Sequence, residues 1–341
     1  MRGGGDVRVE ANGLFDAGTS ARVLAAHDVP GVSSTDVAGR LHRRWVRAAG
    51  RDVQVELTLV EDAGIDVLVQ RTGGSLGRAA PEEGLPPTSA DAGSGGETQR
   101  DLERLVARWF GLEDDLGPAR TALAADPVLA PLLAERPGLR VTGCVDEFEA
   151  VVTAVLGQQV SLAACRTFAG RFVAAARPDP ASGAPGDSPG AGRGRDSGEG
   201  LGLVPFPGPE RYAGLEAAEL QQAVGITGAR ARTLAGVVAA WSEGFRLDAL
   251  PPGEARAALL ALPGIGPWTA EYLAVRLLGD ADTFISGDLV ARRALAGALG
   301  AGPLTPRQAA AHAARWSPWR TYALLHLWAS EAYAVPEEST R

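Results

Sequence analysis

The stretch LLALPGIGPWTAEYLAVRLLGDADTFISGDLVARRAL, residues 259–295, decides the fold of this chain. Gly264 and Gly266 flank one apolar residue between two apolar helical runs. They predict a tight hairpin, because glycine tolerates positive φ and lets another backbone approach closely. Pro267 is favoured at the first position of a helix, so the second helix should begin there. The free N–H groups and positive dipole end of that helix predict a phosphate site that needs no charged side chain.

Asp288 lies 24 residues after Gly264 and directly before the helical run that starts at Leu289. An aspartate in this position is a good N-cap, which is the simple structural interpretation. The helix dipole also keeps such a carboxylate ionised at neutral pH. A charged carboxylate there can stabilise a developing positive charge or orient a water molecule. Both interpretations can hold for the same residue.

Composition limits the chemistry that the chain can perform. The net charge of −8 argues against a nucleic-acid binder, although many of the acids fall in predicted linkers. All 33 residues in the Lys+Arg count are arginine, so mechanisms that need a catalytic lysine are excluded. Cys144 and Cys165 are expected to be buried free thiols, and no cysteine cluster predicts zinc or an iron–sulfur group. With no apolar leader or long apolar run, we expect a cytoplasmic protein without a membrane contact.

The fold class predicted from the pattern is α+β. Residues 1–112 should form a mixed domain with an antiparallel sheet, and residues 113–341 an all-helical domain. Residues 52–59 and 64–70 alternate like strands, residues 16–26 resemble a helix, and residues 40–47 fit a basic strand or a connector. Two Gly/Pro/Ser-rich stretches interrupt the pattern. We expect a flexible loop at 72–97 and a disordered insertion at 177–202.

Together with motifs elsewhere, the hairpin closely resembles the AlkA-type 3-methyladenine DNA glycosylase II family of the helix-hairpin-helix DNA glycosylases. The resemblance covers most of the chain outside the two linkers. It is carried by RPGLRVTGCVD at 136–146, LGQ at 156–158, Phe206-Pro207 and the tail RWSPWRTYALLHLW at 315–328. It implies an N-terminal α+β domain packed on the helical domain, with the lesion site between them. The N-terminal region looks short beside the family pattern, so the sequence leaves open whether this region contributes residues to that site.

The resemblance assigns the catalytic role to Asp288. Bifunctional members carry a lysine nucleophile where this chain has Trp268, so it implies a monofunctional enzyme that releases the base and leaves the backbone uncut. The implied partner is double-stranded DNA with alkylated purines such as 3-methyladenine and 7-methylguanine. A monomer without a cofactor is expected.

Trp268, Tyr272 and Trp328 are the predicted substrate pocket. The first two are four residues apart on one helix face, and aromatic walls suit a base that has been flipped out of the duplex. A cationic alkylated base would gain roughly 0.5–2 kcal/mol from each well-placed aromatic contact. Taken one at a time, each of these aromatics fits a core position better than a pocket, and only the three together with Asp288 favour the pocket.

The predicted DNA contacts are backbone groups at Gly264, Gly266 and Thr269, with Gln159 in the place where the family inserts an apolar wedge. The resemblance also implies a monovalent cation at the hairpin. Its ligands would be the main-chain carbonyls of Leu260, Leu262 and Gly264.

Three other interpretations remain open at this point. The chain could be a DNA-binding module that keeps the hairpin without catalysis, a glycosylase for another lesion, or a structural partner in a repair assembly. Oxidised-purine members usually carry the lysine and mismatch-adenine members four cluster cysteines, and this sequence has neither. Arg292, Arg293, Arg315 and Arg320 are candidate phosphate contacts, with an ion pair as the alternative for Arg320.

Overall fold

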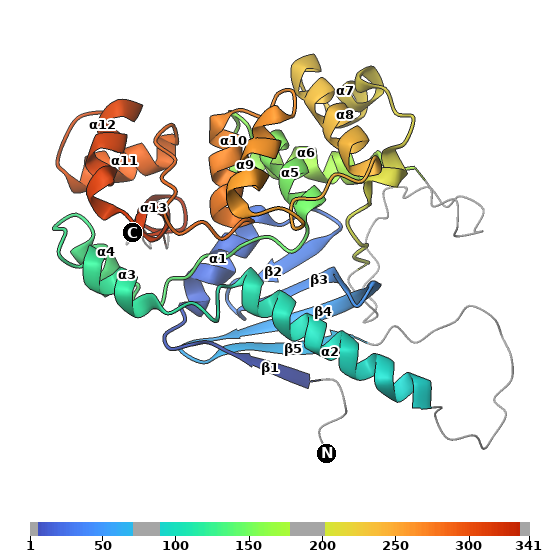
Figure 1. The fold of residues 1–341 in the computed structure, drawn as a ribbon, viewed down its shortest axis with the longest axis horizontal. Helices are drawn as coiled ribbons and strands as arrows, with labels where there is room; N and C mark the ends of the chain where they lie inside the picture. Colours follow the sequence, from blue (N-terminus) through green and yellow to red (C-terminus); the bar gives the residue numbers. More distant parts are fainter. Residues whose placement is uncertain (1–5, 71–88, 178–201, 335–341) are drawn as a thin grey trace, which may run out of the picture.

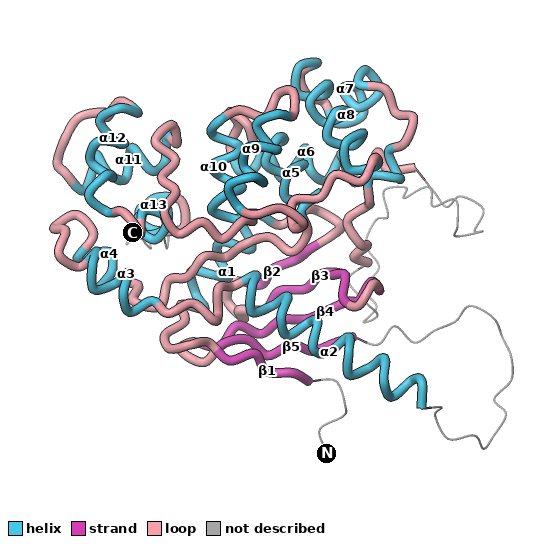
Figure 2. Tube along the Cα trace, viewed as in Figure 1, coloured by secondary structure: helices cyan, strands magenta, loops and turns pink. Residues whose placement is uncertain are grey.

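The computed structural model describes residues 6–70, 89–177 and 202–334. An antiparallel sheet packs with the helices α1 (Ala17–His27) and α2 (Ser89–Trp109), and the remaining helices gather beside this unit (Figures 1 and 2). This arrangement confirms the predicted α+β class. Among the residues described, no helix is long and apolar enough to cross a membrane.

The sheet has five strands in the order β1-β5-β4-β3-β2, and every neighbouring pair is antiparallel. Its strands are β1 Asp6–Glu10, β2 Ser33–Asp36, β3 Leu41–Ala48, β4 Arg51–Val60 and β5 Gly64–Gln70. Alternate residues of β4, namely Val55, Leu57 and Leu59, are buried in one apolar cluster with the helices α1 and α2. The period of two therefore places one face of the sheet against helices.

The strands predicted at 52–59 and 64–70 and the helix predicted at 16–26 are present as β4, β5 and α1 (Ala17–His27). Asp16 caps α1 by accepting the amide of Thr19. The basic run at 40–47 is the strand β3. Neither β1 nor β2 was predicted. The strand β2, SSTD, has no apolar residue, whereas the apolar alternation of β1, DVRVE, covers only five residues and was missed.

The prediction of a flexible loop at 72–97 is wrong for its last part, because α2 runs from Ser89 to Trp109. Leu102, Val106 and Trp109 anchor this helix in the apolar cluster of the sheet. Once a helix is nucleated by such packing, each further residue adds a hydrogen bond, so even a glycine-rich sequence can extend it. Residues 72–88 and residues 178–201 of the predicted insertion lie outside the described part of the chain.

Short helices make up the rest of the molecule. They are α3 Leu116–Leu123, α4 Ala130–Glu135, α5 Glu147–Leu156, α6 Leu162–Ala174, α7 Ala217–Val224, α8 Gly228–Ser242, α9 Pro252–Ala261, α10 Pro267–Arg276, α11 Leu289–Ala298, α12 Pro306–Ala313 and α13 Arg320–Glu331. They bury two apolar clusters: one from α5 to α10, and one from α3, α4 and α11 to α13. Tyr272 of α10 packs against both clusters.

Arg140 joins the sheet region to the helices. Its side chain is 2% exposed and donates hydrogen bonds to carbonyls of both regions, with partners at Asn12, Leu14, Gly111, Leu112 and Asp114. A second link is the buried ion pair between Arg44 of β3 and Glu149 of α5, at 2.5 Å. These contacts fix the sheet against the helices.

Candidate active site

The hairpin between α9 and α10 uses its two glycines differently. Gly264 has a φ of +86°, and a Cβ added there would lie 1.9 Å from the hydroxyl oxygen of Thr233 in α8. Gly266 has a φ of −98°, and a Cβ there would meet no atom within 4 Å. The first glycine is therefore required by the fold, whereas the second leaves an open surface in front of α10.

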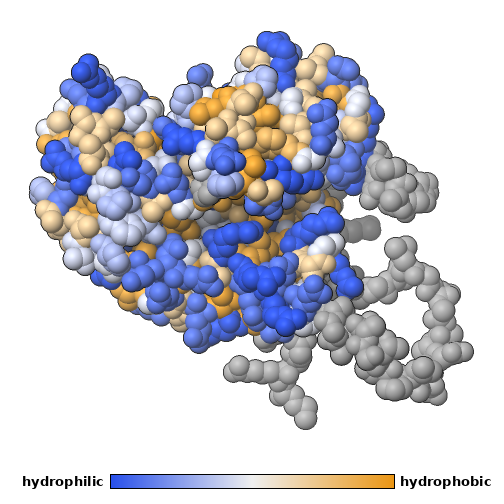
Figure 3. Space-filling view, viewed as in Figure 1, coloured by the Kyte–Doolittle hydropathy of each residue, from blue (hydrophilic) through white to orange (hydrophobic). Residues whose placement is uncertain are grey.

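The start of α10 has no side-chain cap, since the N-cap residue is Gly266 and Pro267 follows it. Apolar side chains gather over α9 and α10 on the face in view (Figure 3), and Leu260 there is 44% exposed. Thr269 is 1% exposed, and its hydroxyl accepts a hydrogen bond from Gln158 Nε2 at 3.0 Å. The structure thus leaves almost none of Thr269 exposed at this surface, main chain included.

Gln158 also donates to the carbonyl of Gly264 at 3.3 Å, and its own carbonyl accepts from Arg230 at 2.5 Å. This network ties the turn after α5 to the hairpin. The next residue, Gln159, is exposed and has a φ of +55°. Its side chain is thus presented from a rigid turn beside the hairpin, as a residue that inserts into a duplex needs to be.

Asp288 is the N-cap of α11 and lines the cavity described below. Its Oδ1 accepts the amide of Ala291 at 2.8 Å and the indole Nε1 of Trp328 at 3.1 Å. The indole Nε1 of Trp268 lies 3.4 Å from Oδ2. The capping interpretation is confirmed, and two indole donors fix the carboxylate in addition.

The three predicted pocket aromatics lie together. The rings of Trp268 and Tyr272 are stacked at 5.4 Å with 13° between their planes. Tyr272 and Trp328 are 6.2 Å apart and tilted by 50°. The three rings form one contiguous aromatic group, which we call the aromatic wall, and a planar ligand can lie against its uncovered ring faces. Burial raises the pKa of Tyr272, so its hydroxyl stays protonated.

A cavity of about 280 Å³ brings these residues together. Asp288, Trp268, Tyr272 and Trp328 all line it. The N-terminal region supplies another wall, despite the doubt raised by its short sequence, with Leu24, His27, His42 and Arg44. The cavity therefore lies where the sheet region meets both helical clusters.

Arg276 also lines the cavity and was missed by the sequence analysis. It lies four residues after Tyr272 and eight after Trp268, so the three residues share one face of α10. Its side chain is 6% exposed. Its spacing of four residues from Tyr272 and eight from Trp268 could have identified Arg276 from the sequence.

Cys144 and Cys165 are free thiols, as expected, but they are partly exposed and line the cavity. The prediction that they are buried is therefore wrong, since the cavity leaves one side of each residue uncovered. Burial of the sulfur groups still raises both pKa values, for Cys165 to about 11. Both thiols are protonated at neutral pH and are poor nucleophiles. Within the described ranges, no group of His, Cys, Asp and Glu could hold a metal ion.

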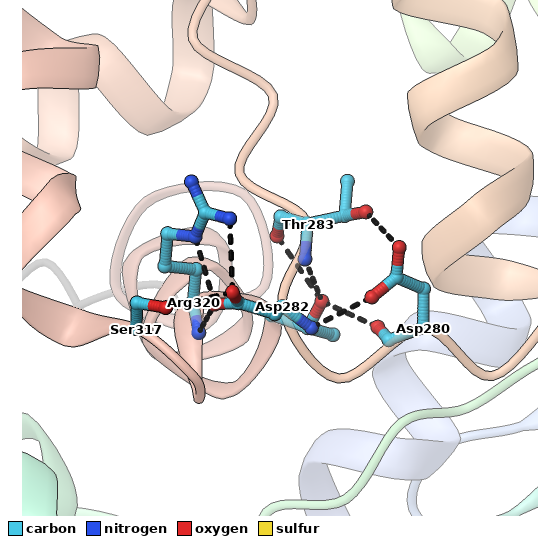
Figure 4. Close-up of polar contacts among 6 residues, drawn as sticks. Asp280, Asp282, Thr283, Ser317 and Arg320 are labelled. Carbon is cyan, nitrogen blue, oxygen red and sulfur yellow. Dashed lines mark hydrogen bonds and ion pairs between the residues drawn. The ribbon is translucent and has the colours of Figure 1, made fainter. Parts of the chain in front are cut away.

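Arg320 forms an ion pair with Asp282, with bonds of 2.7 and 2.9 Å, while Ser317 donates to the same carboxylate (Figure 4). The ion-pair alternative is therefore confirmed for this arginine. Arg293 pairs with Glu331, and Arg292 donates to the carbonyl of Leu304. The exposed Arg315 bonds only the nearby carbonyl of His312 among the residues described.

The hairpin carbonyls are compatible with a monovalent cation. The carbonyl of Leu262 accepts the amide of Ile265 at 3.1 Å, and that of Gly264 accepts Gln158. Each retains a second lone pair, because a carbonyl oxygen can accept two hydrogen bonds. Leu260 lies in the last turn of α9, where helix carbonyls lack partners within the helix.

The chain has clear relatives among DNA repair proteins. It is 41% identical over 241 residues to a Mycobacterium tuberculosis protein named as a probable bifunctional transcriptional activator/DNA repair enzyme AlkA, covering 69% of this chain and 44% of the relative. It is 36% identical over 216 residues to DNA-3-methyladenine glycosylase 2 of Escherichia coli, covering 61% and 66%. The chain thus spans less than half of the first relative and about two thirds of the second. No family model matches the chain.

The fold is shared with solved glycosylase structures. The 3-methyladenine DNA glycosylase of Archaeoglobus fulgidus has a TM-score of 0.70 at 18% identity, with 96% of this chain and 98% of that chain covered. An 8-oxoguanine glycosylase/lyase of Clostridium acetobutylicum has a TM-score of 0.61 at 14% identity, with 95% and 94% covered. The Escherichia coli relative, about two thirds of which is covered, carries the assignment: the chain belongs to the DNA-3-methyladenine glycosylase II (AlkA) family.

Proposed function

We propose that the protein is a monofunctional DNA glycosylase that hydrolyses the N-glycosidic bond of alkylated purines in double-stranded DNA. 3-Methyladenine and 7-methylguanine are the proposed substrates. The observation that carries the proposal is the position of Asp288, which two indole N–H groups hold at the cavity beside an aromatic wall. All of these groups come from one chain, so a monomer is sufficient.

Asp288 supplies the charge that the reaction needs. As the glycosidic bond breaks, positive charge develops on the sugar, and a fixed carboxylate stabilises it. The amide of Ala291 and the two indole donors hold this carboxylate in place at the start of α11. The same carboxylate can orient or deprotonate the attacking water.

The aromatic wall of Trp268, Tyr272 and Trp328 suits a flipped, cationic base. A purine alkylated at N3 or N7 is already a good leaving group, so no general acid is needed to protonate it. The sequence contains no lysine for a Schiff base, which favours simple hydrolysis to an abasic site.

Duplex DNA would be held at the hairpin. The open main chain around Gly266 and the uncapped start of α10 can bind a backbone phosphate without a basic side chain. Gln159, presented beside the hairpin, would fill the gap that the flipped base leaves. A monovalent cation on the carbonyls of Leu260, Leu262 and Gly264 would add positive charge to this phosphate site.

The test is the release of free bases from methylated duplex DNA by the wild type and by Asp288→Asn. An amide oxygen can still cap α11, so the variant should fold while losing the charge. We expect 3-methyladenine release to fall by at least roughly 10³-fold, because about 4 kcal/mol of transition-state stabilisation is lost. The DNA backbone should remain uncut until alkali treatment.

Asp115→Asn is the matched control, since Asp115 caps α3 by accepting the amide of Gly117 and does not line the cavity. It should retain the wild-type rate. If the wild type binds methylated DNA and releases no base, the chain acts as a binding module and the catalytic proposal fails. If Asp288→Asn retains the rate, the role of this carboxylate fails.

A further inference from the structure

Arg276 is a buried cation without an anionic partner. It is the last residue of α10, lines the cavity and is 6% exposed. Its Nε is shielded from solvent and has no hydrogen-bond partner. The other buried arginines of the described residues are each held by an ion pair or by hydrogen bonds to carbonyls; they are Arg44, Arg136 and Arg140. Within the described residues, no carboxylate forms an ion pair with Arg276.

The groups around Arg276 do not supply a negative charge. Tyr272, Tyr333 and Cys144 are its close neighbours, and burial raises the pKa of each, so all three are neutral. His27 is neutral as well, because burial and the charge of Arg276 lower its pKa to about 3. The thiol of Cys144 is a weak hydrogen-bond partner of Arg276. A buried guanidinium with so few acceptors is unfavourable unless a ligand provides more.

The direction of the side chain places these donors beside the aromatic wall. Long side chains on a helix lean toward its N-terminus, so Arg276 extends over the turn that carries Tyr272. Trp268, whose indole contacts Asp288, lies one further turn along the same face. A base that lies against Tyr272 and Asp288 therefore occupies the same cavity that Arg276 lines.

We propose that Arg276 is a specificity-determining residue, which donates to two adjacent acceptors of a neutral flipped purine, the carbonyl oxygen O6 and the ring nitrogen N7. A guanidinium donates in a planar fork that matches two adjacent acceptors. A neutral purine with a carbonyl group therefore gains charge-assisted hydrogen bonds there, whereas a cationic alkylated purine meets a like charge. The aromatic wall and Arg276 thus select two different classes of damaged base in one cavity.

This inference rests on the proposed glycosylase function, and its test separates the two. Release of 3-methyladenine by the wild type tests the proposed function. The inference is tested by the ratio of hypoxanthine release to 3-methyladenine release, measured for the wild type and for Arg276→Met. We expect this ratio to fall roughly 10- to 100-fold, the effect of losing hydrogen bonds from a charged donor.

Arg256→Met is the matched control, because Arg256 pairs with Glu271 outside the cavity lining. It should leave the ratio unchanged. Thermal unfolding of each variant checks that the fold is retained. An unchanged ratio in folded Arg276→Met overturns the inference, even where 3-methyladenine release is intact.

A second measurement uses the wild type alone and holds even if Arg276→Met does not fold. Two duplexes carry either hypoxanthine or the unsubstituted purine base, which lacks the carbonyl group. Each enzymatic rate is divided by the rate of acid hydrolysis of the same nucleoside. We expect this corrected rate to be at least roughly 10-fold higher for hypoxanthine. Equal corrected rates for the two bases contradict recognition of the carbonyl group.

Discussion

Two buried arginines differ in how the surrounding protein satisfies their guanidinium groups. One lies at the junction between the sheet and the helices, and the other lines the cavity. Arg140 at the junction donates to five main-chain carbonyls, and no solvent or ligand is needed to satisfy it. Arg276 in the cavity is almost as buried, yet its guanidinium has no carboxylate partner among the described residues. The comparison teaches that burial alone does not separate structural from functional charge. Whether the protein itself satisfies the group is the better criterion.

The largest effect on stability should come from Arg140→Met. The substitution removes one hydrogen-bond donor from each of five main-chain carbonyls at the junction, which should lower the free energy of unfolding by about 3–5 kcal/mol. Denaturant unfolding measures this loss. A loss below about 1 kcal/mol would break the comparison from the junction side, since solvent would then be able to replace the guanidinium.

The hairpin provides the same contrast without any charge. Gly264→Ala should lower stability by about 2–5 kcal/mol, because its φ is positive and the added methyl group collides with Thr233. Gly266→Ala meets no atom and should change stability by less than about 0.5 kcal/mol. Its methyl group would instead weaken the binding of duplex DNA at the start of α10. Thermal unfolding and DNA titration of both variants distinguish the two glycines.

His326 extends the comparison to a buried basic group that stays neutral in the folded protein. Burial lowers its pKa to about 4, whereas the unfolded chain takes up the proton near 6.5. The free energy of unfolding should therefore fall as the pH is lowered from about 6.5 toward 4, by about 2 kcal/mol at pH 5 from this group. His326→Leu should show a shallower decline over this interval. Identical pH profiles would contradict this account.

The smallest change is expected for the stability of Arg276→Met. Removing a buried charge that lacks a partner should leave the free energy of unfolding unchanged or raise it by up to about 2 kcal/mol. Arg140→Met, measured in the same way, is its natural reference. If both substitutions destabilise the protein equally, Arg276 is structural and the distinction between the two regions disappears.

Much of the site could be predicted from sequence because its residues lie on local, periodic elements. Asp288 directly precedes a helical run, and Trp268 and Tyr272 are one turn apart after a glycine hairpin. Such relations follow from the 3.6-residue period alone. The antiparallel strands β4 and β5 were predictable for the same reason, since their apolar residues alternate.

The remaining features depend on contacts between distant parts of the chain. The strand β2 is recognisable only from its pairing with β3, because its four residues, SSTD, include no apolar side chain. From the sequence, Arg320 fits both a phosphate contact and an ion pair, and only the position of Asp282 in the fold distinguishes the two. The share of the N-terminal region in the cavity, through His42 and Arg44, likewise has no local signal.

Tyr272 has a mechanical consequence, because it packs against both helical clusters. Any breathing motion that separates the clusters also changes the distance between its ring and that of Trp328. The width of the cavity is therefore coupled to the elasticity of the whole helical region. The cavity should accordingly admit larger bases at higher temperature, without the opening of any loop at its entrance.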